Sequence, residues 1–384
     1  MVFKNSWKKT VRILYITRKY PPQVGGMEKT NFYLSQNLGK HVNVELVSRA
    51  ASNMWLHLSL FYLFTKSIWV LLRRRVDLIH LGDALLAPLG LTLKLIFKKP
   101  VSVTVHGLDV TWEFGPYQFL IPKCLKRLDS IVCVSNETRE ECIKRGLNKN
   151  KITVIPNGID PDEFYIARDT QELREKLSDR LGLELRNKAI LLSVGRLVER
   201  KGFHWFVEDV VPRLLKKNKQ IIHLIAGTGE MRKTLEKIVS GHDLQEHVKL
   251  LGRVDDQTLK LLYNVSDIFI MPNIKVKGDM EGFGIVALEA ASCELPVVAA
   301  RLEGIQDAIE DDVNGFLVTS HDAQGFTSVV RQLLADDAKR KAFGERAKNF
   351  TNKNYGWDKI ANEYLLQFKK SIEESRSSSQ LLRT

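Results

Sequence analysis

The length, composition and charge of the chain exclude several classes of protein. Its 384 residues are too many for one ordinary hydrophobic core and suit two domains. With 44% hydrophobic and 27% charged residues, the chain is neither intrinsically disordered nor collagen-like. Its four cysteines form no CxxC pair, which argues against a zinc site or a disulfide framework and favours a reducing cytosol.

Positive charge is concentrated in the first part of the chain. Residues 1–160 contain 24 Lys and Arg against 11 Asp and Glu, whereas the remainder contains 34 of each. We therefore expect the first part to meet an anionic partner, and we favour a membrane surface. Nucleic acid is disfavoured because no recognised binding module accompanies the charge. A solvated basic face without any partner is the alternative.

Short apolar strands alternate with helical stretches through most of the chain. Six strands are expected in the first half, at 12–17, 43–48, 77–81, 101–105, 130–134 and 152–155. Six more are expected in the second half, at 189–194, 221–226, 248–251, 267–271, 296–299 and 315–318. This alternation predicts an α/β fold with two parallel sheets and helices on both faces. The charged segment 168–188 is the expected junction.

Residues 54–72 are apolar on nearly every side and include Phe61 and Trp69. Their length raises the question of a transmembrane span. His57 and Lys66 interrupt the segment, and a span would place neighbouring sheet strands on opposite sides of the bilayer. The sequence therefore favours either a helix lying in the membrane interface or an ordinary packed helix.

Two carboxylates, Glu281 and Glu289, lie eight positions apart around a glycine-containing segment. Gly282 and Gly284 let the backbone approach a ligand, and the N–H groups from Gly284 and Ile285 onward form a helix start suited to a diphosphate. Eight residues are a little over two helical turns, so Glu289 points along the ligand-facing side. We expect one carboxylate to bind sugar hydroxyls and the other ribose hydroxyls. A surface Glu beside an unrelated helix Glu is the alternative.

Two cations, Arg196 and Lys201, follow the expected strand 189–194. Ligands of open α/β sheets bind at the carboxyl ends of the strands, where these side chains emerge. Fixed cations there would neutralise the charge that develops on a departing nucleotide. Two ordinary surface cations in a loop are the simpler alternative.

Weaker signals occupy other loops that follow strands. A glycine pair near a first strand can approach a phosphate, a GxG segment can pass close to a base or ribose, and a polar group at a strand end can face a ligand. These residues are Gly25 and Gly26, then Gly227 and Gly229, and finally His106 and Asp109. Each glycine signal alone indicates little more than a turn. A lone histidine is more often structural, but its place at a strand end favours a functional role for His106.

Together and in this order, the motifs resemble the retaining glycosyltransferases of family 4, the glycosyl transferases group 1, which have the GT-B fold. The resemblance rests on Gly25-Gly26, His106-Gly107, Pro156-Asn157-Gly158-Ile159-Asp160, Gly195-Arg196, Lys201-Gly202 and the Glu281/Glu289 pair, and it extends from residue 12 to about residue 364. It implies two Rossmann-like domains facing across a cleft. The first comprises residues 1–167 together with a C-terminal helix, 357–384, that crosses back to it. The second, nucleotide-sugar-binding domain comprises 168–356.

The resemblance also implies roles for individual residues. Arg196 and Lys201 would bind the donor diphosphate, Glu281 the transferred sugar and Glu289 the ribose, while His106 would lie beside the sugar. The residues expected to take part in catalysis are His106, Arg196, Lys201 and Glu281. The other donor-binding residues are Gly26, Gly227, Gly229, Arg253, Phe283, Gly284, Ile285 and Glu289. The acceptor-side residues are Gly25, Gly26, His106 and Asp109, of which Asp109 is the least secure.

The expected reaction moves a hexose from a nucleotide-diphosphate sugar to an acceptor hydroxyl with retention of configuration. No cofactor or metal is expected, because two cations serve the diphosphate and Asp160-Pro161-Asp162 lies in a turn. By resemblance, the leaving phosphate helps to deprotonate the acceptor. The acceptor is expected to be a glycan or a lipid-linked cell-envelope molecule. The expected location is the cytoplasm, with peripheral attachment to the inner face of the cytoplasmic membrane as an option.

Other functions remain as alternatives. A nucleotide-sugar epimerase on the same fold would turn over without an acceptor, and a phosphorylase would need free phosphate and a pyridoxal-bound lysine. A non-catalytic nucleotide-sugar-binding protein would have no reason to keep Arg196, Lys201, Glu281 and Glu289 together. A nicotinamide dehydrogenase is disfavoured because neither half has a GxGxxG motif directly after its first strand.

Overall fold

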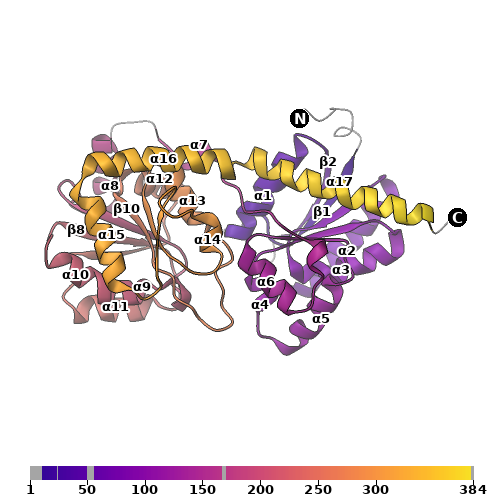
Figure 1. Ribbon diagram of the computed structural model, residues 1–384, viewed down its shortest axis with the longest axis horizontal. Coiled ribbons are helices and arrows are strands. Elements are labelled where there is room, and N and C mark those ends of the chain that lie inside the picture. The colour runs from indigo at the N-terminus through magenta and orange to yellow at the C-terminus, as the bar shows by residue number, and fades with distance from the viewer. Residues whose placement is uncertain (1–10, 24, 50–55, 167–169, 382–384) are drawn as a thin grey trace. The chain divides into compact units, whose positions relative to one another are not determined.

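The computed structural model describes residues 11–23, 25–49, 56–166 and 170–381, without the side chains of 378–381. The chain forms two compact units (Figure 1). Unit 1 comprises Met1–Gly158 and Trp357–Thr384, and unit 2 comprises Ile159–Gly356. The boundary expected between residues 167 and 168 lies outside the described residues.

Unit 1 is built on a six-stranded parallel sheet in the order β2-β1-β3-β4-β5-β6. Its strands are β1 (Arg12–Thr17), β2 (Asn43–Ser48), β3 (Leu78–Leu81), β4 (Val101–Val105), β5 (Ser130–Cys133) and β6 (Ile152–Val154). Its helices are α1 (Gly26–Gly39), α2 (Leu56–Arg73), α3 (Ala87–Phe97), α4 (Leu108–Thr111), α5 (Gly115–Leu125), α6 (Asn136–Lys144) and α17 (Trp357–Leu381).

Alternate residues of β1 supply the two hydrophobic cores of unit 1. Leu14 and Ile16 belong to the core under α2 and α3, whereas Ile13 and Tyr15 belong to the core under α1 and α17. This division follows from the two-residue period of a strand, whose side chains alternate between the faces of the sheet. The last helix, α17, thus packs on the sheet of the first unit.

Unit 2 repeats the architecture with the strand order β12-β11-β10-β7-β8-β9, all parallel. Its strands are β7 (Ala189–Val194), β8 (Ile221–Ala226), β9 (Val248–Gly252), β10 (Ile268–Met271), β11 (Val297–Ala300) and β12 (Phe316–Val318). Its helices are α7 (Pro161–Phe164), α8 (Thr170–Leu181), α9 (Phe203–Trp205), α10 (Val211–Leu215), α11 (Arg232–Gly241), α12 (Asp256–Val265), α13 (Ile285–Ser292), α14 (Ile305–Ala308), α15 (Ala323–Ala335) and α16 (Asp337–Tyr355). The predicted α/β class and all twelve predicted strands are confirmed, with ends that shift by one residue at most.

The strand order reverses direction once in each sheet. In unit 1 the chain runs from β1 to β2 on one side and then returns to β3 on the other. In unit 2 it runs from β7 through β8 to β9 and then returns to β10 on the other side of β7. Ligands of open parallel sheets bind beyond the carboxyl ends of the strands at such a reversal. The loops after β1 and β3, and after β7 and β10, are therefore the places to look for a site.

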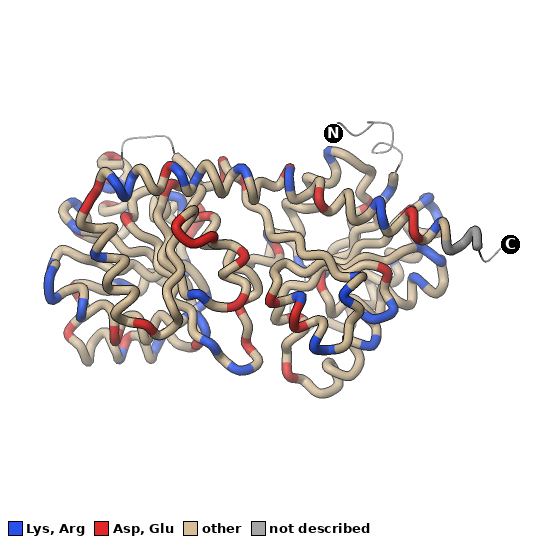
Figure 2. The backbone as a smooth tube through the Cα atoms, viewed as in Figure 1, with Lys and Arg blue, Asp and Glu red and all other residues tan. Residues whose placement is uncertain are grey.

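The apolar segment 54–72 forms most of α2, with its first two residues outside the described part. Leu63 and Val70 are buried against the sheet, while Phe61 and Leu72 are exposed. None of the described helices, α2 included, combines the length and apolar character that a bilayer span requires. Figure 2 shows that Lys and Arg are spread around unit 1 and are not confined to one element.

Candidate functional site

A buried cluster of opposite charges lies where the chain leaves β7 and β10 in unit 2. Lys201 ends a 3₁₀ turn after β7, and Glu281 follows β10 at the entrance to α13. The Nζ of Lys201 lies 2.5 Å from Oε2 of Glu281, and both side chains are largely buried, with exposed fractions of 9% and 12%. Asn273 Nδ2 donates a hydrogen bond to the same oxygen at 3.0 Å. The structure thus brings together a predicted cation and a predicted carboxylate that are eighty residues apart.

Arg200 belongs to this cluster, although the sequence interpretation passed over it. Its Nε lies 3.6 Å from Oε2 of Glu281, and a terminal nitrogen bonds to Asp279 Oδ2 at 3.2 Å. Among the described residues, Arg200 Nε and the carbonyl oxygen of the buried Asn273 side chain have no hydrogen-bond partner. The sequence offers one indication of this role, a second cation directly before Lys201, but a surface cation at this position would give the same pattern.

The charges of the cluster set the protonation of its members. Burial raises the pKa of Glu281, but Lys201, Arg200 and the hydrogen bonds of the carboxylate lower it further, so the net shift is downward. Burial also lowers the pKa of Lys201, against the opposing influence of Glu281. Glu281 is therefore ionised at neutral pH, and its charge is what allows cations to be buried here.

The other predicted cation, Arg196, lies exposed just beyond β7. Its charge contributes to lowering the pKa of Lys201, which places the two cations in electrostatic contact. Among the described residues, the Arg196 guanidinium makes no hydrogen bond or ion pair. Arg196 thus presents a free guanidinium beside the buried Lys201.

The start of α13 has the geometry predicted from its glycines. Gly284 precedes the helix with φ +88°, a left-handed conformation that favours glycine, and Ile285 is the first helical residue. Phe283 is buried to 2% exposure and packs toward the ring of Tyr355, so only its backbone can face a ligand. An anion at this helix start would lie within the loop that carries Glu281.

Glu289 is buried within α13 and accepts a hydrogen bond from the Tyr263 hydroxyl at 2.8 Å. Tyr263 comes from α12 and is fully buried. The sequence did not single out this tyrosine, because a tyrosine in an apolar helix face reads as an ordinary core residue. The hydrogen bond fixes one carboxylate oxygen of Glu289.

Glycines after β7 and β8 pack the two loops together. A side chain at Gly227 would overlap the carbonyl oxygen of Gly195, and one at Gly229 would overlap that of Leu197. The backbone N–H of Gly227 also bonds to Gly252, which directly precedes the exposed Arg253. These contacts place Gly227, Gly229 and Arg253 at the same edge of the sheet as Arg196, and they give the glycines a packing role.

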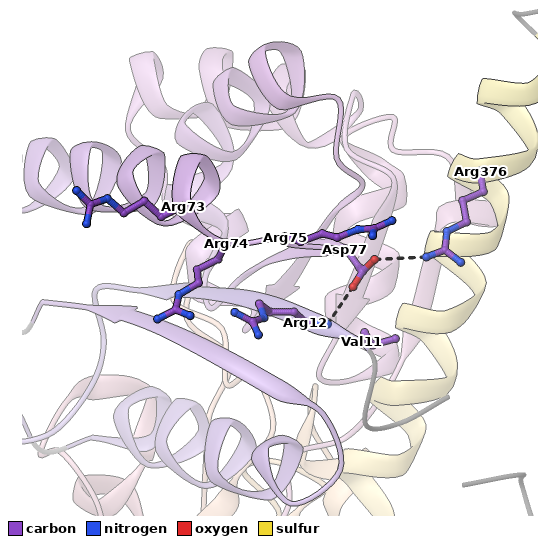
Figure 3. Close-up of a pocket in the computed structure, with 7 residues that line it drawn as sticks. All are labelled: Val11, Arg12, Arg73, Arg74, Arg75, Asp77 and Arg376. Atoms are coloured by element: carbon purple, nitrogen blue, oxygen red, sulfur yellow. Dashed lines mark hydrogen bonds and ion pairs between the residues drawn. The ribbon is translucent and has the colours of Figure 1, made fainter. Parts of the chain in front are cut away.

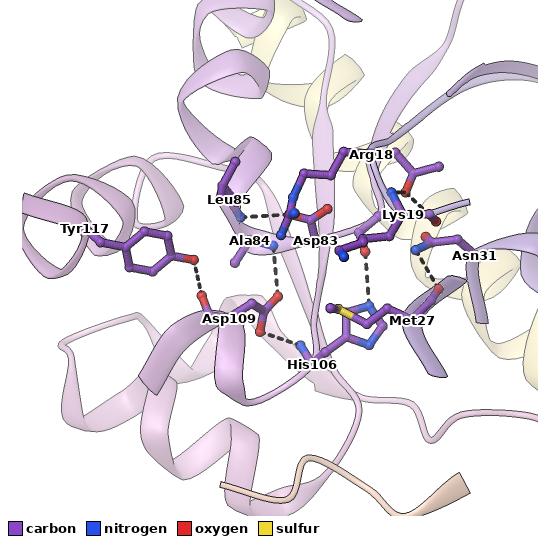
Figure 4. A network of polar contacts seen from close by, with 12 residues as sticks. Arg18, Lys19, Met27, Asn31, Asp83, Ala84, Leu85, His106, Asp109 and Tyr117 are labelled. Atoms are coloured by element: carbon purple, nitrogen blue, oxygen red, sulfur yellow. Dashed lines mark hydrogen bonds and ion pairs between the residues drawn. The ribbon is translucent and has the colours of Figure 1, made fainter. Parts of the chain in front are cut away.

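Unit 1 carries a second polar network at the carboxyl ends of β3 and β4 (Figure 4). Asp109 accepts hydrogen bonds from the backbone N–H groups of His106 at 2.8 Å and Ala84 at 3.0 Å, and Tyr117 donates its hydroxyl to the Asp109 carbonyl. The His106 ring contacts the carbonyl of Gly82 through Nε2 at 3.0 Å. The two predicted residues, His106 and Asp109, therefore belong to one network, in which Asp109 fixes the loop that presents His106.

Asp83 is a further member of this network that the sequence interpretation missed. It is fully buried, and its Oδ1 accepts from Arg18 Nε at 3.1 Å and from the N–H of Leu85. Its Oδ2 has no hydrogen-bond partner among the described residues. The signal available in the sequence was a carboxylate two residues after the end of the buried strand β3.

Gly25 and Gly26 lie at the start of α1. Gly25 precedes the helix, and a side chain there would overlap the carboxylate of Glu28, which pairs with Lys19 at 3.1 Å. Gly26 is the exposed first residue of α1. Their loop follows β1 and so lies at the carboxyl edge, on the strand next to β3.

The Asp160–Asp162 pair forms a local turn. Asp160 caps α7 by accepting the N–H of Asp162 at 3.1 Å. Over the part of the chain that the structure describes, no three His, Cys, Asp or Glu side chains are grouped as metal ligands would be. Independence of a metal stays a prediction.

Two protein-family models match the chain, Glycosyltransferase Family 4 over residues 24–163 and Glycosyl transferases group 1 over residues 175–350. An uncharacterized glycosyltransferase of Methanocaldococcus jannaschii is 30% identical over 317 residues, which are 80% of this chain and 79% of the relative. A GDP-mannose-dependent α-(1-6)-phosphatidylinositol monomannoside mannosyltransferase of Mycolicibacterium smegmatis is 26% identical, with 90% and 95% of the two chains covered.

Among solved structures, Anabaena HepE in complex with UDP has a TM-score of 0.75 at 20% identity, with 94% of this chain and 100% of that chain covered. Sucrose-phosphate synthase from Thermosynechococcus elongatus has a TM-score of 0.74 at 20% identity, with 94% and 98% covered. These likenesses, with the two six-stranded parallel sheets, define the GT-B class of fold. The chain belongs to glycosyltransferase family 4, which confirms the resemblance found in its sequence.

Proposed function

We propose that the protein is a retaining, metal-independent hexosyltransferase that uses a nucleotide-diphosphate sugar. The observation that carries the proposal is the cluster of Lys201, Arg200 and Glu281 beside the start of α13, at the reversal point of the unit 2 sheet. Relatives support a nucleotide-sugar donor: a GDP-mannose-dependent mannosyltransferase, and an Escherichia coli galactosyltransferase named for UDP-Gal. Because the relatives differ in nucleotide and sugar, the donor is left to experiment.

Each part of the unit 2 site has a defined task in this proposal. Arg196 and Lys201, with the backbone at the start of α13, bind the diphosphate and stabilise the charge that develops as the nucleotide leaves. Glu281 accepts hydrogen bonds from sugar hydroxyls and compensates Lys201, while Glu289 accepts from the ribose. His106 and Gly26 of unit 1 serve the acceptor side.

The reaction breaks the bond between the sugar C1 and the diphosphate oxygen and forms a bond between C1 and the acceptor oxygen. The acceptor hydroxyl proton passes to the leaving phosphate, and the nucleoside diphosphate is the second product. Both events occur on one face of the sugar, so the configuration at C1 is retained. The protein's part is to supply fixed positive charge, which leaves no task that requires a metal or another cofactor.

We further propose that the acceptor is a lipid-linked cell-envelope molecule, which the protein reaches from the cytoplasmic face of the membrane. The apolar side chains of Phe61 and Leu72 on α2 are 67% and 73% exposed, and Lys66 and Arg73 lie over the ring of Trp69. Such a mixture of exposed apolar, aromatic and basic residues is typical of helices that lie in a membrane interface. Relatives named for phosphatidylinositol monomannoside and diphosphoundecaprenol acceptors support it.

The donor proposal is tested by incubating the full chain with UDP-, GDP- and ADP-hexoses, with and without EDTA, and measuring thermal shift and nucleoside diphosphate release. We expect one nucleotide class to raise Tm, turnover to survive EDTA, and Glu281→Ala and Lys201→Ala to lose at least 100-fold in kcat/KM. The anomeric configuration of the product is read by NMR. Turnover that persists in both variants contradicts the proposal, and conversion of the donor without acceptor or release points to an epimerase.

The membrane part is tested by flotation with anionic vesicles. We expect Phe61→Ser with Leu72→Ser to reduce the floated fraction severalfold without changing Tm, since both side chains are exposed. A protein that stays in the soluble fraction at low salt contradicts this part and leaves the donor proposal intact.

A further inference from the structure

A cavity of about 560 Å³ opens in unit 1 at the amino ends of its strands (Figure 3). Arg12 is the first residue of β1, and Asp77 directly precedes β3. Because a strand advances about 3.3 Å per residue, the cavity lies roughly 17 Å from the loops at the carboxyl ends. It is therefore separate from the network of His106 and Asp109. The lining residues are Val11, Arg12, Arg73, Arg74, Arg75, Asp77 and Arg376.

The cavity carries an excess of positive charge. The only carboxylate in its lining, that of Asp77, is already shared: Oδ2 accepts the backbone N–H of Arg12 at 3.0 Å, and Oδ1 accepts from Arg376 at 3.3 Å. Outside the lining, Glu45 pairs with the Arg12 guanidinium at 3.0 Å. Five arginines against these two carboxylates leave three positive charges without an ion-pair partner among the residues that the structure describes.

Local structure accounts for the placement of Arg73 but not for that of Arg74 and Arg75. Arg73 ends α2, where a cation is favoured by the helix dipole, and its guanidinium lies 4.7 Å from the Trp69 ring centroid. Arg74 and Arg75 lie between α2 and β3, and in the described part of the chain neither guanidinium makes a hydrogen bond or an ion pair. Both nevertheless line the same cavity as the other cations, despite mutual repulsion.

We propose that this cavity binds a phosphate group with two negative charges, as a phosphomonoester or a diphosphate. Guanidinium groups bind phosphate oxygens in a bidentate fashion, and clusters of arginines are a recurring means of capturing phosphate groups. The volume is ample for a diphosphate with part of its attached group. The same chemistry is offered by a lipid headgroup and by a free phosphorylated molecule, and the experiment separates these sources.

The first arm titrates the full chain with inorganic pyrophosphate at low salt by calorimetry. We expect Arg74→Gln with Arg75→Gln to weaken one class of site at least tenfold, whereas Lys216→Gln with Lys217→Gln, two exposed cations of unit 2, leaves it unchanged. Pyrophosphate can also bind the proposed donor site, so Arg196→Gln is titrated in parallel. The proposal is overturned if the variant with both Arg74→Gln and Arg75→Gln binds pyrophosphate as tightly as the wild type does. This holds whatever the Arg196→Gln variant shows.

The second arm measures flotation with phosphatidylcholine vesicles that contain phosphatidic acid or, at equal anionic charge, phosphatidylglycerol. Stronger flotation with phosphatidic acid that Arg74→Gln with Arg75→Gln abolishes supports a lipid headgroup. If Arg74→Gln with Arg75→Gln weakens pyrophosphate binding but the protein shows no preference between the two kinds of vesicle, a free phosphorylated ligand is supported. No pyrophosphate binding and no vesicle preference in the wild type overturns the proposal. Because Arg74 and Arg75 are exposed, their substitution leaves folding intact, which circular dichroism and Tm check.

Discussion

Replacing Glu281 by Gln removes the charge that compensates two buried cations. Lys201 and Arg200 each have 9% exposed side chains, and Oε2 of Glu281 is 2.5 Å from the first and 3.6 Å from the second. Breaking a buried ion pair on one side costs about 3–5 kcal/mol. Glutamine keeps an acceptor, and Arg200 keeps Asp279 as a partner, so the expected loss is about 3 kcal/mol, at the lower end of that range.

Hydrogen exchange of the full chain measures this loss. Amides of β7 and β8 lie in unit 2 and report its opening free energy. Glu236→Gln is the matched control: it removes the same charge from a surface pair with Arg232 and should change stability by less than about 0.5 kcal/mol. A loss in Glu281→Gln no larger than in this control refutes the reasoning.

The pH dependence of the same variant is a second check. Burial raises the pKa of Glu281, but the neighbouring cations and hydrogen bonds lower it more, so the folded pKa lies below the unfolded one. The stabilisation from its charge is therefore present at neutral pH and disappears as the pH falls through the folded pKa. The difference between wild type and Glu281→Gln should be constant above about pH 5 and shrink below it. A difference that grows on acidification contradicts the assignment.

Three further outcomes follow from buried groups of unit 2. Burial lowers the pKa of His223 to about 3, so the unfolded state takes up the proton first, and this group lowers the stability of unit 2 by about 2 kcal/mol from pH 7 to 5. His223→Leu should remove this contribution from the pH dependence that hydrogen exchange measures in β7 and β8, and an unchanged pH dependence contradicts it. Gly202 has φ +66°, and a side chain there would overlap a backbone carbonyl, so Gly202→Ala should lower the opening free energy measured by hydrogen exchange by at least about 2 kcal/mol. Gly241→Ala, where a side chain would enter open space, should not lower it. Tyr263→Phe removes one hydrogen bond to the buried Glu289 carboxylate and should lower the opening free energy, measured in the same way, by about 1–3 kcal/mol. An unchanged opening free energy contradicts this prediction.

The sequence alone determined the features that depend on neighbours along the chain. Apolar runs of strand length, separated by helical stretches, predicted twelve strands and the α/β class, because burial on both faces demands such runs. Gly284 predicted a helix start, which the structure places at Ile285. The charged residues Arg196, Lys201 and Glu281 led to the prediction of a site for a diphosphate sugar. The family resemblance rests on these same local motifs.

Tertiary structure decided which of these side chains meet and in what state. Parallel strands that are adjacent in a sheet can be far apart in sequence, as β7 and β10 are, so the pairing of Lys201 with Glu281 depends on strand order. Arg200 resembled a surface cation and Asp83 a loop carboxylate until burial and partners were known, because both depend on packing across the sheet edge. The arginine cavity likewise gathers the start of β1, the end of α2 and the last helix, which no local pattern connects.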